Sequence, residues 1–223
     1  MDTVRQVRFV WKPLVFTVSL LPFLLVVGDL YGISGQLGAN PIEEIQDRFG
    51  NWGLRFILVA LAVTPLRRLS GWNWLQRFRR MLGLFAFFYV LMHFLVWLFL
   101  DRELLNQVLA GGEGAFAQQT SIWGLIVEDI VERPFITIGF AALLILTALA
   151  ATSTTGVRRR LGRRWQRLHN GVYVAAILGV WHYWWQVKLD ASDPLIYAIA
   201  LSILLGYRAW HRWAPALRAQ GGT

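Results

Sequence analysis

The chain has 223 residues, of which 56% are hydrophobic and 16% charged, against about 25% charged in an average soluble domain. Its 22 Lys and Arg against 13 Asp and Glu give a formal net charge of +9, and the basic residues punctuate long apolar runs. This pattern excludes an ordinary soluble globule, a disordered chain and a water-exposed nucleic-acid-binding module, and it predicts an all-α polytopic membrane protein. The chain contains no cysteine, which excludes disulfides, thiolate zinc sites, iron–sulfur clusters and covalently attached c-type haem.

Six apolar segments are candidates for membrane-spanning helices, because a helix needs about 20 apolar residues to cross a hydrocarbon core of about 30 Å. They cover residues 13–31, 52–66, 81–100, 134–151, 168–187 and 194–210. No small-residue cleavage site follows the basic N-terminus, which favours an uncleaved first span over a signal peptide. The second segment is the shortest and contains Arg55, which we expect to extend outward beside Trp52. We therefore expect a six-helix transmembrane bundle that forms a single domain over residues 1–223.

Charged residues indicate the orientation of these spans. Basic residues cluster near residues 5–12, 67–80, 158–167 and 208–218, all on one side of the six-span arrangement, whereas every acidic residue except Asp2 falls on the other side. The positive-inside rule then places both termini in the cytoplasm, in agreement with an even number of spans. No acidic residue falls in the middle of a span, which disfavours a proton-relay pump or an ion carrier.

Two polar segments outside the spans each allow two interpretations. The longest outer connection contains an amphipathic run at residues 122–131, which is either an interfacial or re-entrant element or a loop helix on the outer end of the bundle. The inner segment 158–167 contains six arginines. These could bind a phosphate, a propionate or an acidic cytosolic partner, or they could simply fix the topology and attract anionic membrane lipids.

Two histidines inside the predicted spans give the chemical signal, since an ionisable residue in a membrane is costly and by default marks function. His93 lies 13 residues after Arg80, and His182 lies 15 residues after Arg167, or about 20 Å and about 22 Å along their helices. Both spans run outward, so we expect the two imidazoles at similar depth in the outer half of the bilayer. Two neutral imidazoles on separate helices, with no cysteine available, suit the axial positions of a haem b iron.

An aromatic shell beside these histidines would enclose the porphyrin, and its expected members are Phe94, Trp97, Trp181 and Trp184. The alternative is structural, because an intramembrane histidine also hydrogen-bonds a backbone carbonyl or a hydroxyl of a neighbouring helix. The matched depth of two histidines favours the haem.

The other two histidines lie nearer the cytoplasmic side. His169 precedes His182 by 13 residues, which rotates it about 140° away from the first face. Arg79 stands 14 residues before His93; it cannot ligate iron but could contact a haem propionate. His169 is therefore a candidate ligand of a second haem with an unusual partner, a contact at a cofactor's edge, or a helix cap. His211, between two interfacial residues, is interpreted as an anchor.

Several stretches together resemble the haem-binding membrane subunits of protein-methionine-sulfoxide reductase systems, within the ferric-reductase-like transmembrane family. They are residues 37–41 (LGANP), 64–66 (TPL), 79–84 (RRMLGL), 133–139 (RPFITIG), 152–154 (TST), 161–170 (LGRRWQRLHN) and 182–183 (HY). The resemblance covers nearly the whole chain. Two features depart from the NADPH oxidases and ferric reductases: no flavin and NADPH domain is fused to the chain, and Arg79 stands where an inner-site histidine is found.

The resemblance implies a b-type cytochrome of the bacterial inner membrane that is not catalytic alone. Such a subunit takes electrons from the quinone pool or a cytosolic flavin reductase and passes them to MsrP, a periplasmic molybdopterin enzyme that repairs methionine sulfoxide in oxidised proteins. His93, His169 and His182 fall on the family's haem histidines. The family also implies FMN, for which the sequence offers no residue. Two alternatives stay open: a stand-alone ferric or quinone reductase, and a non-redox membrane scaffold whose histidines are structural.

Overall fold

The computed structural model describes residues 3–101, 124, 126–187 and 192–220, and within these ranges all regular secondary structure is helical. The main helices are α1 (Thr3–Gln6), α2 (Lys12–Leu30), α3 (Pro41–Ser70), α4 (Arg79–Val96), α7 (Pro134–Ala151), α8 (Thr155–Leu161), α9 (Arg163–His169), α10 (Gly171–Gln186) and α11 (Ser192–Gln220). π-Helical turns follow α1 and α4, and a 3-10 turn joins α3 to α4. The prediction of an all-α fold is confirmed.

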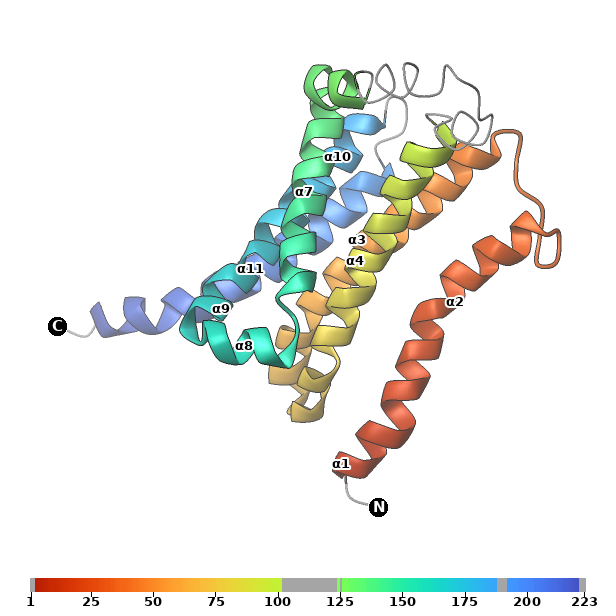
Figure 1. Ribbon diagram of the computed structural model, residues 1–223. Coiled ribbons are helices and arrows are strands. Elements are labelled where there is room, and N and C mark those ends of the chain that lie inside the picture. Colours follow the sequence, from red (N-terminus) through yellow and green to blue (C-terminus); the bar gives the residue numbers. More distant parts are fainter. Residues whose placement is uncertain (1–2, 102–123, 125, 188–191, 221–223) are drawn as a thin grey trace.

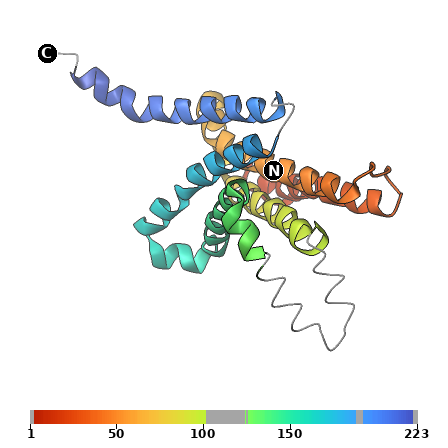
Figure 2. The same ribbon diagram turned by 90° about the horizontal axis from the view of Figure 1, so that it is seen from above.

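Four helices form a central bundle (Figures 1 and 2). The helices α3 and α4 make one antiparallel pair and α7 and α10 make the other, and the two pairs touch through α4 with α7 and through α3 with α10. The helix α2 lies against α3 and α4, and α11 lies against α3 and α10. Each of α3, α4, α7 and α10 therefore contacts two others of the four, around a common centre.

Four helical segments of the described chain are long and apolar enough to cross a membrane: Val4–Leu30, Pro41–Ser70, Arg79–Asp101 and Pro134–Ala151. They contain the first four predicted spans, apart from Tyr31 at the end of the first. The fifth predicted span corresponds to the 16 residues of α10, and the sixth lies inside α11. A membrane crossing by α10 and α11 stays a prediction.

The second span is much longer than the sequence predicted. Instead of residues 52–66, α3 covers 30 residues from Pro41 to Ser70. Asn40 caps its start by accepting a hydrogen bond from the Glu43 backbone N–H, with Pro41 in the first turn. Gly71, at φ +74°, ends the helix. The additional N-terminal turns are polar, so hydropathy alone did not include them, but they carry residues that line the site.

Arg55 lies near Trp52, as expected, and its guanidinium stands 4.8 Å from the centre of the indole ring. It also has a partner that the sequence did not predict, because its Nε donates to the Tyr197 hydroxyl of α11 at 2.9 Å. The exposed arginine therefore links two helices instead of only extending toward water.

Side chains of neighbouring helices satisfy the backbone beside two prolines inside helices. Near Pro22 of α2, the Tyr89 hydroxyl of α4 donates to the Ser19 carbonyl at 2.7 Å and accepts from the Phe23 N–H at 3.2 Å. These two backbone groups are one helical turn apart, so the hydroxyl sits within the helix's own hydrogen-bond ladder. Tyr89 is fully buried, and its hydroxyl joins α2 to the bundle.

Pro65 of α3 offers no N–H to the carbonyl of Leu61, four residues earlier. The Arg208 guanidinium of α11 donates to that carbonyl and, at 3.1 Å, to the Leu204 carbonyl of its own helix. The Leu61 carbonyl, which lacks its helical donor, therefore accepts a hydrogen bond from the half-buried Arg208 guanidinium where α11 crosses α3.

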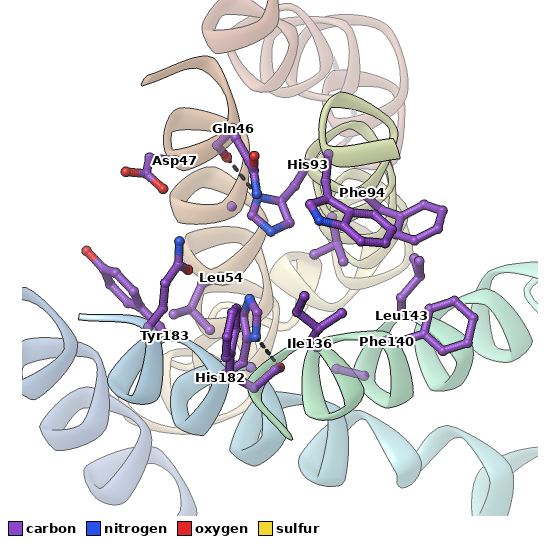
Figure 3. Close-up of a pocket in the computed structure, with 18 of the residues that line it drawn as sticks. Gln46, Asp47, Leu54, His93, Phe94, Ile136, Phe140, Leu143, His182 and Tyr183 are labelled. Atoms are coloured by element: carbon purple, nitrogen blue, oxygen red, sulfur yellow. Dashed lines mark hydrogen bonds between the residues drawn. The ribbon is translucent and has the colours of Figure 1, made fainter. Parts of the chain in front are cut away.

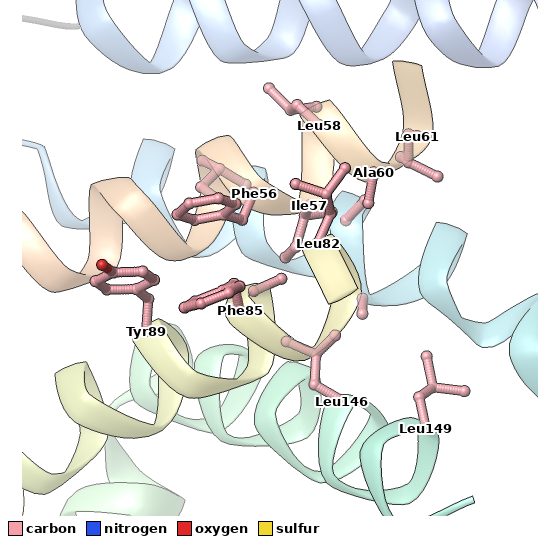
Figure 4. Close-up of a cluster of buried hydrophobic side chains, with 14 of the residues drawn as sticks. Phe56, Ile57, Leu58, Ala60, Leu61, Leu82, Phe85, Tyr89, Leu146 and Leu149 are labelled. Atoms are coloured by element: carbon pink, nitrogen blue, oxygen red, sulfur yellow. The ribbon is translucent and has the colours of Figure 1, made fainter. Parts of the chain in front are cut away.

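The apolar core lies mainly between α3 and α4 and extends to α7 (Figure 4). Phe56 and Tyr89 stack with ring centres 5.3 Å apart and planes 5° apart, and Phe85 lies 5.6 Å from Phe56. Between membrane helices, lipid removes most of the hydrophobic driving force, so close packing and interhelical hydrogen bonds must hold the bundle together.

We expect Tyr89→Phe to lower the free energy of unfolding by about 1–2 kcal/mol, because it keeps the ring but removes the two hydrogen bonds that the hydroxyl makes to the Ser19 carbonyl and the Phe23 N–H. Unfolding of the detergent-solubilised protein by heat or denaturant would measure the change. Tyr31→Phe is the matched control, since Tyr31 is 77% exposed. Equal stability of the two variants would show that the inserted hydroxyl does not hold α2.

Candidate functional site

A cavity of about 350 Å³ lies between α3, α4, α7 and α10, a size within the range of pockets that hold organic ligands. Its walls are mainly apolar. They include Leu54 and Ile57 of α3, Val90 and Phe94 of α4, Ile136, Phe140, Ala142, Leu143 and Leu146 of α7, and Ala175 and Gly179 of α10. A mostly apolar chamber inside a helix bundle is typical of a cofactor site.

The imidazoles of His93, on α4, and His182, on α10, face one another across this cavity (Figure 3). Their ring centres are 6.0 Å apart, and the ring planes make an angle of 82°. The structure therefore brings together two histidines that are 89 residues apart in the sequence.

Each ring is held by a backbone carbonyl of the adjacent helix. Nδ1 of His93 lies 2.8 Å from the Gln46 carbonyl oxygen on α3, and Nδ1 of His182 lies 2.7 Å from the Phe135 carbonyl oxygen on α7. A carbonyl can only accept, so Nδ1 carries the proton in both rings. Nε2 of each neutral imidazole then keeps its lone pair, and in Figure 3 these nitrogens point toward the space between the rings.

This arrangement fits a haem. A metal–imidazole bond is about 2 Å long, so two imidazoles on opposite sides of one metal have ring centres roughly 6 Å apart. A ligating histidine usually donates its other N–H to a carbonyl or carboxylate, as both rings do here. In the described part of the chain no group of three or more His, Cys, Asp or Glu could hold a bare metal ion. Two axial nitrogens and an apolar chamber match a metal whose other ligands come from a porphyrin.

The aromatic shell differs in part from the expectation. Phe94 and Trp97 line the cavity, but Trp181 and Trp184 do not. These two are 51% and 43% exposed and lie on the side of α10 that faces α11 and the surroundings. The reason is helical geometry, since each residue turns the direction by about 100° and Trp181, next to His182, must point elsewhere. Ile136, Phe140 and Leu143 of α7 provide that wall instead.

The mouth of the cavity is polar. Asn40, Glu43, Asp47, Asp101, Arg133 and Gln186 line it. The elements rich in arginine, namely the end of α3, the start of α4, and α8 with α9, lie at the opposite end of the bundle (Figure 1). The histidine pair is therefore displaced toward the end that carries the acidic residues.

His169 lies outside this cavity, at the end of α9. Its Nε2 is 3.1 Å from the Thr152 hydroxyl, and its ring stacks on Trp165 with ring centres 3.9 Å apart. Arg79, at the start of α4, lies within electrostatic range of His169. The His211 ring lies against the Tyr207 ring of the same helix, with ring centres 4.3 Å apart. The structure thus separates His169 and Arg79 from the His93–His182 pair.

Part of the amphipathic run at residues 122–131 falls outside the described residues. Residues 126–132 are helical, and Ile126 is buried against Trp97. The described part of the run therefore packs on the π-helical turn that follows α4, close to the cavity.

Sequence reasoning missed the carbonyls of Gln46 and Phe135, because a backbone acceptor leaves no mark on residue identity. It also missed the polar mouth, because the predicted second span begins at residue 52 and so leaves out the first turns of α3. The N-cap pattern Asn40-Pro41 followed by Glu43 was the available signal for those turns.

Comparison with known proteins is decisive for the family. The family model of the ferric reductase like transmembrane component matches residues 49–180, a range that includes α4, α7 and the first ten residues of α10. The chain belongs to the ferric reductase-like transmembrane family. Its relatives include proteins named protein-methionine-sulfoxide reductase heme-binding subunit MsrQ. Those of Ralstonia nicotianae and Herminiimonas arsenicoxydans are 47% and 46% identical over 91% of this chain and over 86% and 85% of their own lengths. That of Xanthomonas oryzae pv. oryzae is 45% identical over 90% of this chain and 86% of its own length.

Membership of this transmembrane family confirms the prediction of a polytopic membrane protein. The matched range contains His93, His169 and Phe135, whereas His182 lies two residues after its end and Gln46 three residues before its start. The resemblance inferred from short stretches of sequence is confirmed over most of the chain.

We expect Ala142→Phe to reduce the ligand capacity of the cavity severalfold without unfolding the bundle, because a phenyl ring would fill space between α7 and the histidines. Ala142 is buried and lines the cavity. Leu144→Phe is the control, since Leu144 is 55% exposed on the same helix. The absorbance of bound haem per folded protein, measured after purification from haem-replete cells, gives the readout; equal absorbance in both variants would contradict the assignment of the cavity.

Proposed function

We propose that the chain is a b-type cytochrome subunit that carries electrons through the bacterial inner membrane to a periplasmic methionine sulfoxide reductase. The observation that carries the proposal is the facing pair of imidazoles, 6.0 Å apart, with both Nδ1 protons given to helix carbonyls. Histidines that served only to join helices would not need their Nε2 atoms to face each other across an apolar cavity. The scaffold alternative is therefore disfavoured.

In this proposal His93 and His182 would hold one haem b through their Nε2 atoms. The haem, when bound, supplies one-electron chemistry at iron. The chain supplies the rest: the carbonyls of Gln46 and Phe135 fix the tautomer of the rings, and the apolar walls exclude water and so influence the reduction potential. We propose that the subunit is not catalytic alone, since its relatives are named as the heme-binding subunit of a reductase.

The proposed orientation of the chain in the membrane rests on charge. We propose six spans in a single domain over residues 1–223, with both termini cytoplasmic, because the basic clusters gather at one end of the bundle. The histidine pair then lies toward the periplasm, where the partner would be the molybdopterin subunit MsrP. The relatives' name supports a place in such a reductase system. The quinone pool or a cytosolic flavin reductase would deliver electrons at the inner side.

A second haem at the inner side is proposed with His169 as ligand and Arg79 as a propionate contact. What supports it is the approach of Arg79 to His169 at the inner end of α4. Haem binding there would require His169 to exchange its hydrogen bond with Thr152 for the iron. FMN, which the family resemblance implies, has no assigned residue; its phosphate would find guanidinium partners on α8 and α9.

Haem and iron stoichiometry of purified variants tests the assignment. We expect His93→Ala and His182→Ala each to abolish the six-coordinate, low-spin haem spectrum of the central cavity and to lower its haem content, because one imidazole cannot maintain six-coordinate iron, and His211→Ala to keep the full content. His169→Ala should lower two haems per chain to one. A His93→Ala protein with the full haem spectrum would remove the central assignment, and one haem per chain in the unaltered protein would remove His169.

The family model favours a second candidate function, a stand-alone ferric reductase. The two candidates differ in the electron acceptor. We expect the chemically reduced protein in liposomes to be reoxidised at least about tenfold faster by the periplasmic reductase with methionine sulfoxide than by ferric citrate. Faster oxidation by the ferric chelate, with no response to the periplasmic enzyme, would favour the ferric reductase.

A further inference from the structure

The two sides of the histidine pair are built in the same way. On α3, Gly50 follows Gln46 by four residues and lies against His93; on α7, Gly139 follows Phe135 by four residues and lies against His182. In a helix, residues four apart lie on the same face, one above the other. Each imidazole therefore lies against a patch of bare helix backbone formed by a carbonyl and the glycine one turn later.

A side chain at either glycine would occupy the place of the ring. A Cβ added at Gly50 would lie 2.9 Å from Nδ1 and 3.2 Å from Cε1 of His93. A Cβ added at Gly139 would lie 2.8 Å from Nδ1 and 2.9 Å from Cε1 of His182. Contacts this short between a Cβ and a ring held by its own hydrogen bond cannot be relieved without moving the ring.

Helix geometry explains why the glycine stands four residues after the carbonyl. The Cα–Cβ bond points toward the helix N-terminus, so a side chain covers the turn that precedes it. The Gln46 carbonyl already accepts the helical hydrogen bond and has a second lone pair free. A side chain at position 50 would cover that lone pair, and glycine leaves it open. The same holds for the Phe135 carbonyl and position 139.

We infer that Gly50 and Gly139 are positioning residues for the two axial histidines, each exposing the helix carbonyl that fixes its imidazole. The inference rests on the proposed haem function and adds what sets the geometry of the ligands. A carbonyl that accepts from Nδ1 fixes the tautomer, fixes the rotation of the ring and raises the electron donation of Nε2 to a metal. Loss of the bare patch displaces the ring and opens a coordination position.

The chain offers two matched control glycines. Gly53 lies one turn after Gly50 on α3, and a Cβ there would meet Val90 Cγ2 at 2.6 Å, with no histidine involved. A Cβ at position 53 would therefore crowd the contact between α3 and α4 at least as strongly as a Cβ at position 50. Gly206 of α11 has no atom within 4 Å of an added Cβ, so its replacement controls for the substitution itself.

The experiment compares Gly50→Ala, Gly139→Ala, Gly53→Ala and Gly206→Ala as folded, detergent-solubilised full chains titrated with haem. We expect Gly50→Ala and Gly139→Ala to lose about tenfold or more in haem affinity, the scale typical of changes around metal ligands. When saturated with haem, both should show high-spin iron and bind carbon monoxide in the reduced state. The unaltered protein, Gly53→Ala and Gly206→Ala should stay low-spin and unreactive toward carbon monoxide.

A stability cycle without haem provides the second measurement. Gly50→Ala should destabilise the protein when His93 is present and cost little in a His93→Ala background, because the clash partner is then absent. Unaltered spectra in the two glycine variants, an equal loss of haem in Gly53→Ala, or an identical cost in both backgrounds would overturn the inference. Absence of haem from the unaltered protein would instead refute the proposed function, so the two failures are distinguishable.

Discussion

The site depends on one interaction made twice, the hydrogen bond from an imidazole Nδ1–H to a helix carbonyl. At His93 and at His182 this bond decides which nitrogen carries the proton and turns the other nitrogen toward the cavity. An unpaired Nδ1–H in an apolar bundle would be costly in free energy. Without these hydrogen bonds the rings could also rotate, and their Nε2 atoms would no longer face each other. The two carbonyls therefore offset the free-energy cost of burying the histidines and also fix the orientation of the two rings.

The bundle supplies these carbonyls because it consists of two similar helix pairs. In each pair, α4 or α10 contributes the histidine and α3 or α7 contributes the carbonyl. The surrounding helices are attached by polar contacts at irregular points, since Tyr89 joins α2 near Pro22 and Arg208 joins α11 to the carbonyl freed by Pro65. The backbone beside the two helix prolines is thus where side chains of neighbouring helices form hydrogen bonds that connect the helices.

Sequence patterns predicted the helical fold and the histidine pair through hydropathy and helical rise, because both depend on local composition and on distance along a helix. They predicted a short second span, since the polar first turns of α3 interrupt the apolar run. The assignment of Trp181 and Trp184 to the aromatic shell was wrong. It relied on their nearness to His182 in the sequence, which does not determine the direction in which a side chain points. The carbonyls that hold the rings could not be predicted, as their position depends on the packing of α3 on α4 and of α7 on α10.

The central claim is that His93 and His182 bind one iron in the orientation that the structure shows. Electron paramagnetic resonance of the oxidised protein tests this most directly, because the signal of low-spin ferric haem depends on the angle between its two imidazole planes. Planes at 82° predict a highly anisotropic low-spin signal dominated by one large g value, which disappears in His93→Ala. A rhombic signal typical of parallel imidazoles, or a high-spin signal in the unaltered protein, would contradict the account.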